Sequence, residues 1–117
     1  MSSPHSKSSA LAAALAALDA GEQMDRVLLR DAVRATLADL ARRVPGRSVE
    51  VRVPPYGAIQ CVEGPRHTRG TPPNVVEVDP LTWLRVATGR LPWAEAVDRG
   101  MIRMSGVRAD ISSYLPL

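Results

Sequence analysis

The chain has 117 residues and a mass of 12.6 kDa, which is the size of one domain with one hydrophobic core. Its single cysteine, Cys61, excludes an intrachain disulfide and a cysteine-based zinc cluster, and no apolar run approaches the roughly 20 residues that cross a bilayer. The net charge of +3, carried almost entirely by arginine, permits an anionic partner without requiring one. The N-terminus also lacks the apolar core of a secretion signal, so we expect a cytoplasmic protein.

The N-terminal nine residues are serine-rich and are expected to form a disordered tail, with one domain spanning residues 10–117. A first helix is predicted over residues 9–20, because its leucines share one face and Gly21 follows where a helix commonly ends. This alanine-rich helix is compatible with packing on a partner, on a second copy of the chain or on the body of the domain.

A longer helix is predicted from about Asp25 to Val44, with Asp25 as its N-cap and Pro45-Gly46 as its stop. Its apolar residues recur on one face at helical spacing. They are Leu29, Val33, Leu37, Leu40 and Val44.

The apolar period then changes to two, which is typical of half-buried strands. Strands are predicted over residues 49–53, 58–63 and 75–78, with a turn at Pro54-Pro55-Tyr56-Gly57 between the first two. Cys61 is expected to lie on the same face of its strand as Ile59, as a buried and unreactive thiol. The stretch EGPRHTRGTPPN, residues 63–74, has no periodicity and is expected to be a loop, with at most a short edge strand around residues 66–69.

Four further elements are predicted toward the C-terminus: a helix begun by Asp79-Pro80 and ended by Gly89, a short helix from Pro92 to Gly100, a strand over 101–104, and a last helix after Gly106 that ends near Leu115. Strands adjacent in sequence, with helices grouped in blocks, indicate an α+β fold rather than a doubly wound sheet.

The last third of the chain carries a resemblance to a known family. Asp79, Trp83, Leu84 and Gly89, followed by a short helix, Gly100, an Ile/Met strand and Gly106, resemble the carboxyl half of sterol carrier protein domains. The segment from residue 47 to 117 more specifically resembles the bacterial sterol carrier orthologue group, on residues 45–55, residues 64–77 and Pro116. The resemblance implies a mixed sheet of about four to five strands with helices packed on one face, and an apolar cavity between the two layers.

The same resemblance implies a site for a fatty acid, an acyl ester or a sterol-like molecule. Its candidate lining residues are Trp83, Leu84, Trp93, Val97, Ile102, Met104 and Leu115. The alternative is that these side chains form ordinary core. An empty cavity costs about 24 cal/mol per Å³, so such a cavity must hold a ligand, collapse or open to water.

The loop offers a second group of candidate ligand contacts: Arg66, His67, Thr68 and Arg69. Two arginines can grip a carboxylate or phosphate, or they can fasten the loop by pairing with Glu63, Glu77 or Asp79. His67 has neither a nucleophile nor a second metal ligand at a recognised spacing. The sequence therefore predicts no catalytic residue, no metal site and no cofactor.

These observations favour a non-enzymatic carrier or binding module for a lipid or another hydrophobic or amphipathic molecule. The alternative is an accessory or protein-interaction domain without a ligand, related to the C-terminal module of thiol-dependent isomerases. Nucleic acid is not an expected partner, because the chain has no aromatic platform and no recognised binding motif. Membrane contact is expected to be peripheral at most, and a homodimer or a protein partner remains open.

Overall fold

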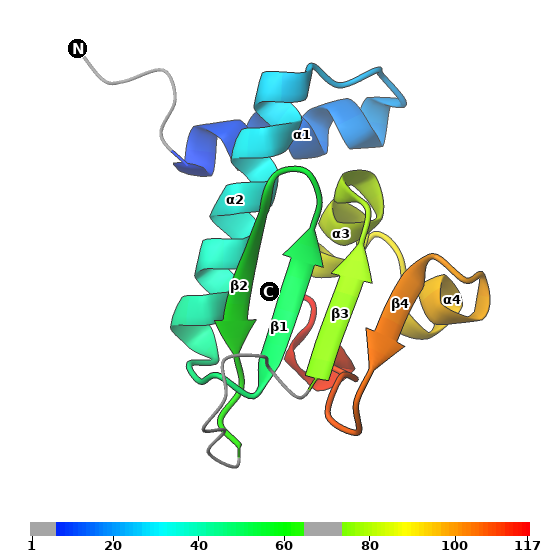
Figure 1. Cartoon of the computed structure of the whole chain (residues 1–117). Coiled ribbons are helices and arrows are strands. Elements are labelled where there is room, and N and C mark those ends of the chain that lie inside the picture. Colours follow the sequence, from blue (N-terminus) through cyan, green and yellow to red (C-terminus); the bar gives the residue numbers. More distant parts are fainter. Residues whose placement is uncertain (1–6, 65–73) are drawn as a thin grey trace.

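The computed structural model describes residues 7–64 and 74–117, and in these ranges the chain forms helices and one mixed sheet (Figure 1). The helices are α1 (Lys7–Ala20), α2 (Arg26–Arg43), α3 (Pro80–Ala87) and α4 (Trp93–Asp98). The strands are β1 (Val49–Val53), β2 (Gly57–Cys61), β3 (Asn74–Val78) and β4 (Ile102–Ser105). The predicted α+β class and the predicted elements through β4 are confirmed. Helix α1 begins two residues before the predicted start, so it takes in residues 7 and 8, which the prediction assigned to the tail alone.

The four strands lie in the order β2-β1-β3-β4. Strand β1 pairs antiparallel with β2 through the predicted hairpin and parallel with β3, and β3 pairs antiparallel with β4. The helices cover one face of this sheet, as the sterol-carrier-like resemblance implied, and no helix of residues 7–64 or 74–117 lies on the other face, which is here called the open face (Figure 1).

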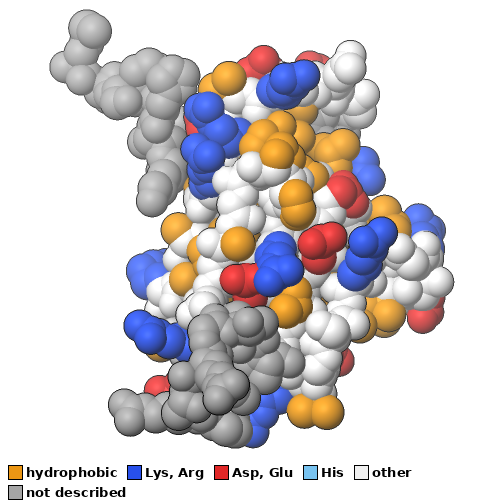
Figure 2. All heavy atoms as spheres, viewed as in Figure 1, with side chains coloured by type: hydrophobic (Ala, Val, Ile, Leu, Met, Phe, Trp, Pro, Cys, Tyr) orange, Lys and Arg blue, Asp and Glu red, His pale blue; other side chains and the backbone are white. Residues whose placement is uncertain are grey.

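The two faces of the sheet differ in chemistry because side chains alternate along a strand. Val49, Val51 and Val53 of β1 point into the core and are fully buried, whereas Glu50 and Arg52 lie on the open face. Acidic and basic side chains alternate across this open face (Figure 2). Glu50 pairs with Arg52, and Glu77 lies 3.8 Å from Arg103 on the next strand. Arg52 also lies opposite Glu77 in the β1–β3 register, so charged neighbours of opposite sign lie side by side on the open face.

The core lies between the sheet and the helices α2 and α3, and its largest side chain is Trp83 of α3. The Trp83 indole Nε1 donates a hydrogen bond of 2.8 Å to the Thr36 hydroxyl of α2. That hydroxyl bonds in turn to the carbonyls of Ala32 and Val33, each at 2.9 Å. The buried polar atoms are thus satisfied, as burial away from water requires.

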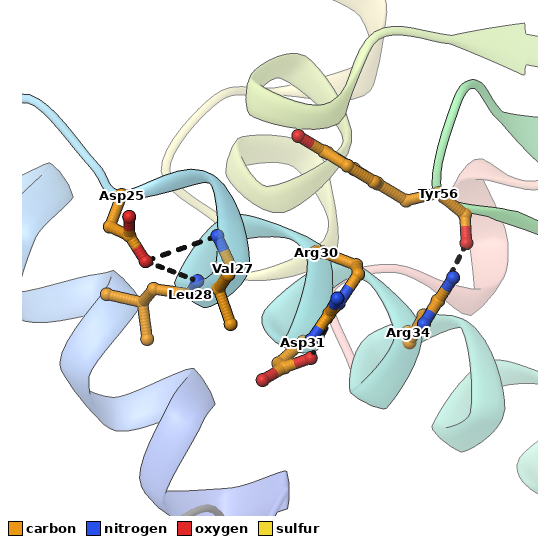
Figure 3. Close-up of polar contacts among 7 residues, drawn as sticks. All are labelled: Asp25, Val27, Leu28, Arg30, Asp31, Arg34 and Tyr56. Carbon is orange, nitrogen blue, oxygen red and sulfur yellow. Dashed lines mark hydrogen bonds and ion pairs between the residues drawn. The ribbon is translucent and has the colours of Figure 1, made fainter.

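Helices α2 and α3 both begin with the predicted N-cap residues. The Asp25 carboxylate accepts hydrogen bonds from the backbone N–H groups of Val27 and Leu28, which would otherwise have no partner at the start of α2 (Figure 3). Nearby, Arg34 Nε donates to the Tyr56 carbonyl at 2.9 Å and ties α2 to the β1–β2 turn. Asp79 caps α3 in the same way through the Thr82 N–H, with Pro80 in the first turn.

The turn after α2 requires a glycine. Gly46 has φ +149°, and a Cβ atom there would lie 2.1 Å from the Val62 backbone. Ser48 N–H donates to the Val62 carbonyl at 3.0 Å, so this close approach fastens the start of β1 to the end of β2. The buried Asn74 side chain extends the fastening: it donates to the Ser48 carbonyl at 2.7 Å and accepts from Arg108 N–H at 2.9 Å.

The predicted last helix is wrong. After β4 the described chain forms only a single 3₁₀ turn, Ser112–Tyr114. The Asp110 carboxylate accepts a 2.9 Å hydrogen bond from Ser112 N–H, a local bond that competes with helix formation. Pro116 follows closely, and proline cannot continue a helix hydrogen-bond ladder.

Candidate functional site: a cleft beside α2

A cleft of about 630 Å³ lies where α1, α2, the end of α3 and the C-terminal residues meet. Its volume is within the range of small-molecule sites, roughly 300–1,000 Å³. The lining residues come from four separate parts of the chain: Leu11, Leu15, Ala35, Thr36, Ala38, Asp39, Arg42, Arg43, Ala87, Thr88, Arg90 and Leu117. Most of the apolar contacts are leucine and alanine side chains.

The floor of the cleft is a flank of α2 made from small residues. Ala35 and Ala38 lie there, and their side chains end at Cβ, so they leave room between α2 and the surrounding leucines. Leu117 closes one side, where its backbone N–H donates a 2.9 Å hydrogen bond to the Ala87 carbonyl at the end of α3. Leu11 and Leu15, four residues apart and hence on one face of α1, form another side.

The rim of the cleft is rich in arginine. Asp39 of α2 lies between two of them: it pairs with Arg42 and lies 3.1 Å from Arg43 Nε, one helical turn away. The side chains of Arg42 and Arg43 are 71% and 51% exposed, so most of their donors face water. Each guanidinium has five N–H donors, more than one carboxylate can occupy.

A third rim arginine, Arg90, forms an ion pair with α1. Its Nε and Nη2 atoms donate to the two carboxylate oxygens of Asp19 at 2.7 and 2.8 Å, which is a bidentate pair. These hydrogen bonds lower the pKa of the Asp19 carboxyl and raise that of the Arg90 guanidinium. Both groups therefore stay charged at neutral pH, and the pair links α1 to the segment between α3 and α4.

The arrangement can hold an elongated amphipathic molecule. An apolar chain fits along the alanine floor between the leucine sides, and an acidic group fits beside the free donors of Arg42 and Arg43. The Asp39 carboxylate in the lining pairs with Arg42 and Arg43, and the hydroxyls of Thr36 and Thr88 donate hydrogen bonds to backbone carbonyls one turn earlier. Among the described residues, no group of three or more possible metal ligands comes together.

The apolar residues expected at a ligand site do not come together in one place. Trp83 and Leu84 are fully buried in the core, and Ile102 is 7% exposed there. Leu115 is half-buried against the same core. None of these four side chains lines the cleft beside α2.

The remaining three, Trp93, Val97 and Met104, do meet, in a shallow depression of about 270 Å³ between α4 and β4. Asp110 and Ser112 form its other side, and hydrogen bonds from Ser112 lower the pKa of the Asp110 carboxyl. The depression is less than half the size of the cleft. Its acidic side also disfavours an anionic ligand.

The expected anion grip of Arg66, His67, Thr68 and Arg69 lies outside the described residues, as does the optional edge strand there. The carboxylates offered as fasteners for these arginines have other contacts in the described part: Glu77 lies near Arg103, and Asp79 caps α3. The base of the loop is held by Asn74 and by Arg108, whose Nη1 lies 3.5 Å from the Glu63 carbonyl.

Sequence reasoning missed the cleft itself. Its walls come from residues more than 100 positions apart, from Leu11 to Leu117, and no local motif joins them. The sequence did contain one signal. On the side of α2 opposite its leucine stripe, two small residues, Ala35 and Ala38, are followed by the basic residue Arg42. Small apolar side chains are unusual on a helix side that faces solvent. The second signal was the leucine face of the first helix, because an apolar helix face is normally buried against another part of the protein.

Two other features bear on function. Burial raises the pKa of the Cys61 thiol to about 11, so at neutral pH this side chain is protonated and a poor nucleophile. Within residues 7–64 and 74–117, no helix is long and apolar enough to cross a membrane.

Comparison with known proteins identifies the family of the chain. No curated protein matches the chain. Residues 25–117 match the family described as bacterial SCP ortholog, a match that runs from the N-cap of α2 to the C-terminus and leaves α1 outside. The match confirms the resemblance seen in the sequence, and it covers the whole sheet with the helices α2, α3 and α4. The chain therefore belongs to the bacterial SCP ortholog family.

Proposed function

We propose that this protein is a non-enzymatic carrier that binds an amphipathic molecule with one apolar chain and an acidic head group in the cleft beside α2. Membership of an SCP-like family supports a lipid-binding role at a coarse level. The observation that carries the finer proposal is the cleft, which combines an apolar floor with arginines that retain free donors.

The charge at the rim favours an acid over a neutral lipid. Arg42 and Arg43 share the single carboxylate of Asp39, whereas Arg90 has both oxygens of Asp19 to itself. The unmet positive charge therefore lies at the C-terminal end of α2. The helix dipole places its negative end there, so these arginines also stabilise the helix, and an acidic ligand would bind to their outward-facing donors.

The packing between sheet and helices supports placing the ligand in this cleft. Val51 of β1, Val76 of β3 and Trp83 of α3 each have no exposed surface, so these side chains fill the space between the layers. The same packing favours the second candidate, an interaction domain with no ligand of its own. The two functions differ in one measurable property, the binding of a free amphiphile by the purified protein.

Native mass spectrometry and displacement of an intrinsically fluorescent polyene fatty acid by palmitate provide that measurement. We expect one ligand per chain and displacement at micromolar concentration. A protein that carries no lipid and shows no binding at micromolar ligand, yet recovers one stoichiometric protein partner in a pull-down, would establish the interaction domain instead.

The head group is tested by replacing both rim arginines, Arg42→Gln with Arg43→Gln. We expect affinity for palmitate to fall roughly fivefold to tenfold, because charged hydrogen bonds to the carboxylate are lost. Affinity for the uncharged alcohol of the same chain length should change less than about twofold. Arg99→Gln is the matched control, since Arg99 pairs with Glu95 one turn away at 2.7 Å, as Arg43 does with Asp39, but lies outside the cleft. Equal losses for acid and alcohol would contradict the assigned head-group position.

A further inference from the structure

Helix α1 lies outside the residues that match the family, yet it forms one side of the cleft. Helix α1 crosses α2 (Figure 1), and Leu11 and Leu15 of α1 line the cleft together with Ala35 and Ala38 of α2. Without α1, Ala35 and Ala38 would lie on an open helix flank, and an apolar ligand there would be covered on fewer sides. The cleft therefore depends on a segment that the family match does not include.

The contacts of α1 with the domain are of two kinds. Two small residues, Ala10 and Ala14, are its buried side chains at 7% and 0% exposure, and they let the two helices approach closely. The leucines at positions 11, 15 and 18 are only partly buried, so they retain surface for further contacts. At the C-terminal end of α1, the bidentate Asp19–Arg90 pair holds the helix to the rest of the chain.

The leucines of α1 face two different hollows. Leu11 and Leu15 line the cleft, whereas Leu18 lines a separate groove of about 310 Å³ with Met24 and Leu81. One helix thus provides both a test position and a control, because Leu15 and Leu18 are the same residue type and both are partly buried, but they line different hollows.

We propose that α1 determines which ligands this protein binds: Leu11 and Leu15 are the specificity-determining contacts for the apolar chain, and the Asp19–Arg90 pair is the positioning contact that keeps them over the floor. This inference rests on the proposed function of the cleft. The occupant is the single-chain acidic amphiphile already argued from the rim arginines, because the floor between α1 and Leu117 is apolar and its open end is basic.

The size of the effect follows from the area that α1 covers. Each methylene group removed from water strengthens binding by a factor of about four. A wall of two leucines on a second side of the ligand is therefore expected to decide between ligands that differ by a few methylenes. If the apolar chain of the ligand contacted α2 alone, the affinity would depend little on the length of that chain.

The first experiment compares Leu15→Ala with Leu18→Ala in the full chain, using the polyene fatty acid as the probe and saturated acids of increasing length as competitors. We expect Leu15→Ala to weaken binding about tenfold, because about three carbon atoms of the wall are lost, and to reduce the dependence on chain length. Leu18→Ala should change affinity less than about twofold. Thermal unfolding of both variants shows whether they lose stability to the same extent, which removes folding as an explanation.

The second experiment tests the positioning pair through dissociation kinetics. Asp19→Asn should speed release of the probe about twofold to fivefold, which is the range expected for an exposed ion pair. Exchanging the two charges, Asp19→Arg with Arg90→Asp, should restore the original rate, since the pair is re-formed in reverse. A purely local structural role of Asp19 would give no such rescue.

The outcomes separate this inference from the proposed function. If the unaltered protein binds no fatty acid, the proposed function fails, and this inference fails with it. If the unaltered protein binds but Leu15→Ala and Leu18→Ala behave alike, the carrier function stands and the role of α1 is overturned. Failure of the charge exchange to restore the release rate would overturn the role assigned to Asp19–Arg90.

Discussion

The core between the sheet and the helices and the cleft beside α2 use the same kinds of aliphatic side chain with opposite results. In the core, Val51 and Val76 face Trp83 and Leu84, and all four are fully buried. In the cleft, the α2 residues that form the floor are Ala35 and Ala38, and the space above their short side chains stays open. The difference indicates that side-chain volume, rather than hydrophobicity, decides where this small domain leaves open space.

The two regions also differ in how their polar groups are satisfied. In the core, the Trp83 indole N–H and the Thr36 hydroxyl, both buried, form a hydrogen bond with each other. The cleft leaves guanidinium donors of Arg42 and Arg43 directed to solvent. A closed region gains from internal pairing, whereas a binding site keeps donors for its ligand.

The largest expected effect comes from emptying the core. Trp83→Ala should lower the free energy of unfolding by about 3–5 kcal/mol, because it removes the largest buried side chain and leaves the Thr36 hydroxyl without its donor. Denaturant unfolding measures this loss. A loss below about 1 kcal/mol would mean that the space between the layers is not tightly packed, and the contrast with the cleft would disappear.

A matched pair of enlargements sharpens the comparison. Val51→Leu adds a methylene group to the filled core and should cost about 1–3 kcal/mol through overpacking. Ala38→Leu adds three carbons to the open cleft and should change the free energy of unfolding by less than about 1 kcal/mol. Ala38→Leu should nevertheless abolish fatty acid binding at micromolar concentration, since it fills the site. Retention of binding by Ala38→Leu would place the ligand elsewhere.

The smallest expected effect concerns thiol chemistry. Burial raises the pKa of Cys61 from 9.0 to about 11, so at pH 8 its thiolate fraction is lower by about 100-fold than that of a free thiol. Iodoacetamide should therefore label Cys61 very slowly in the folded protein, whereas a cysteine introduced at position 38 should react readily and be protected by bound fatty acid. Because the folded state holds the Cys61 proton more tightly, the contribution of Cys61 to stability should be constant below pH 9 and should be lost as the pH rises from 9 toward 11. Rapid labelling of Cys61 at pH 8, as measured by mass spectrometry, would contradict its burial.

Much of the fold follows from local signals in the sequence. The caps Asp25 and Asp79, the period of two in residues 49–53 and the Pro-rich turn after them each specify structure within a few residues, and all are confirmed. The last helix was predicted wrongly because Asp110 forms a local hydrogen bond to Ser112 that outweighs the apolar pattern. Local competition of this kind is not visible in periodicity alone.

The site was less accessible to prediction than the fold. Trp83, one of the two tryptophans expected at the ligand, lies in the core because the α3 helix turns its apolar face toward the sheet, and hydrophobicity does not distinguish core from cavity. The cleft arises from the crossing of α1 over α2 and from Leu117 returning to Ala87. These are tertiary contacts between distant parts of the chain, and they have no sequence motif.

The most direct test of the central claim is a two-dimensional NMR titration of the full chain with dodecanoate, following each backbone amide. We expect the largest chemical-shift changes at the residues around the cleft, namely Leu15, Ala38, Arg42, Ala87 and Leu117, with little change in the core strands at Val51 and Val76. Changes concentrated at β1 and β3, or in the depression formed by Trp93 and Met104, would contradict the cleft as the ligand site.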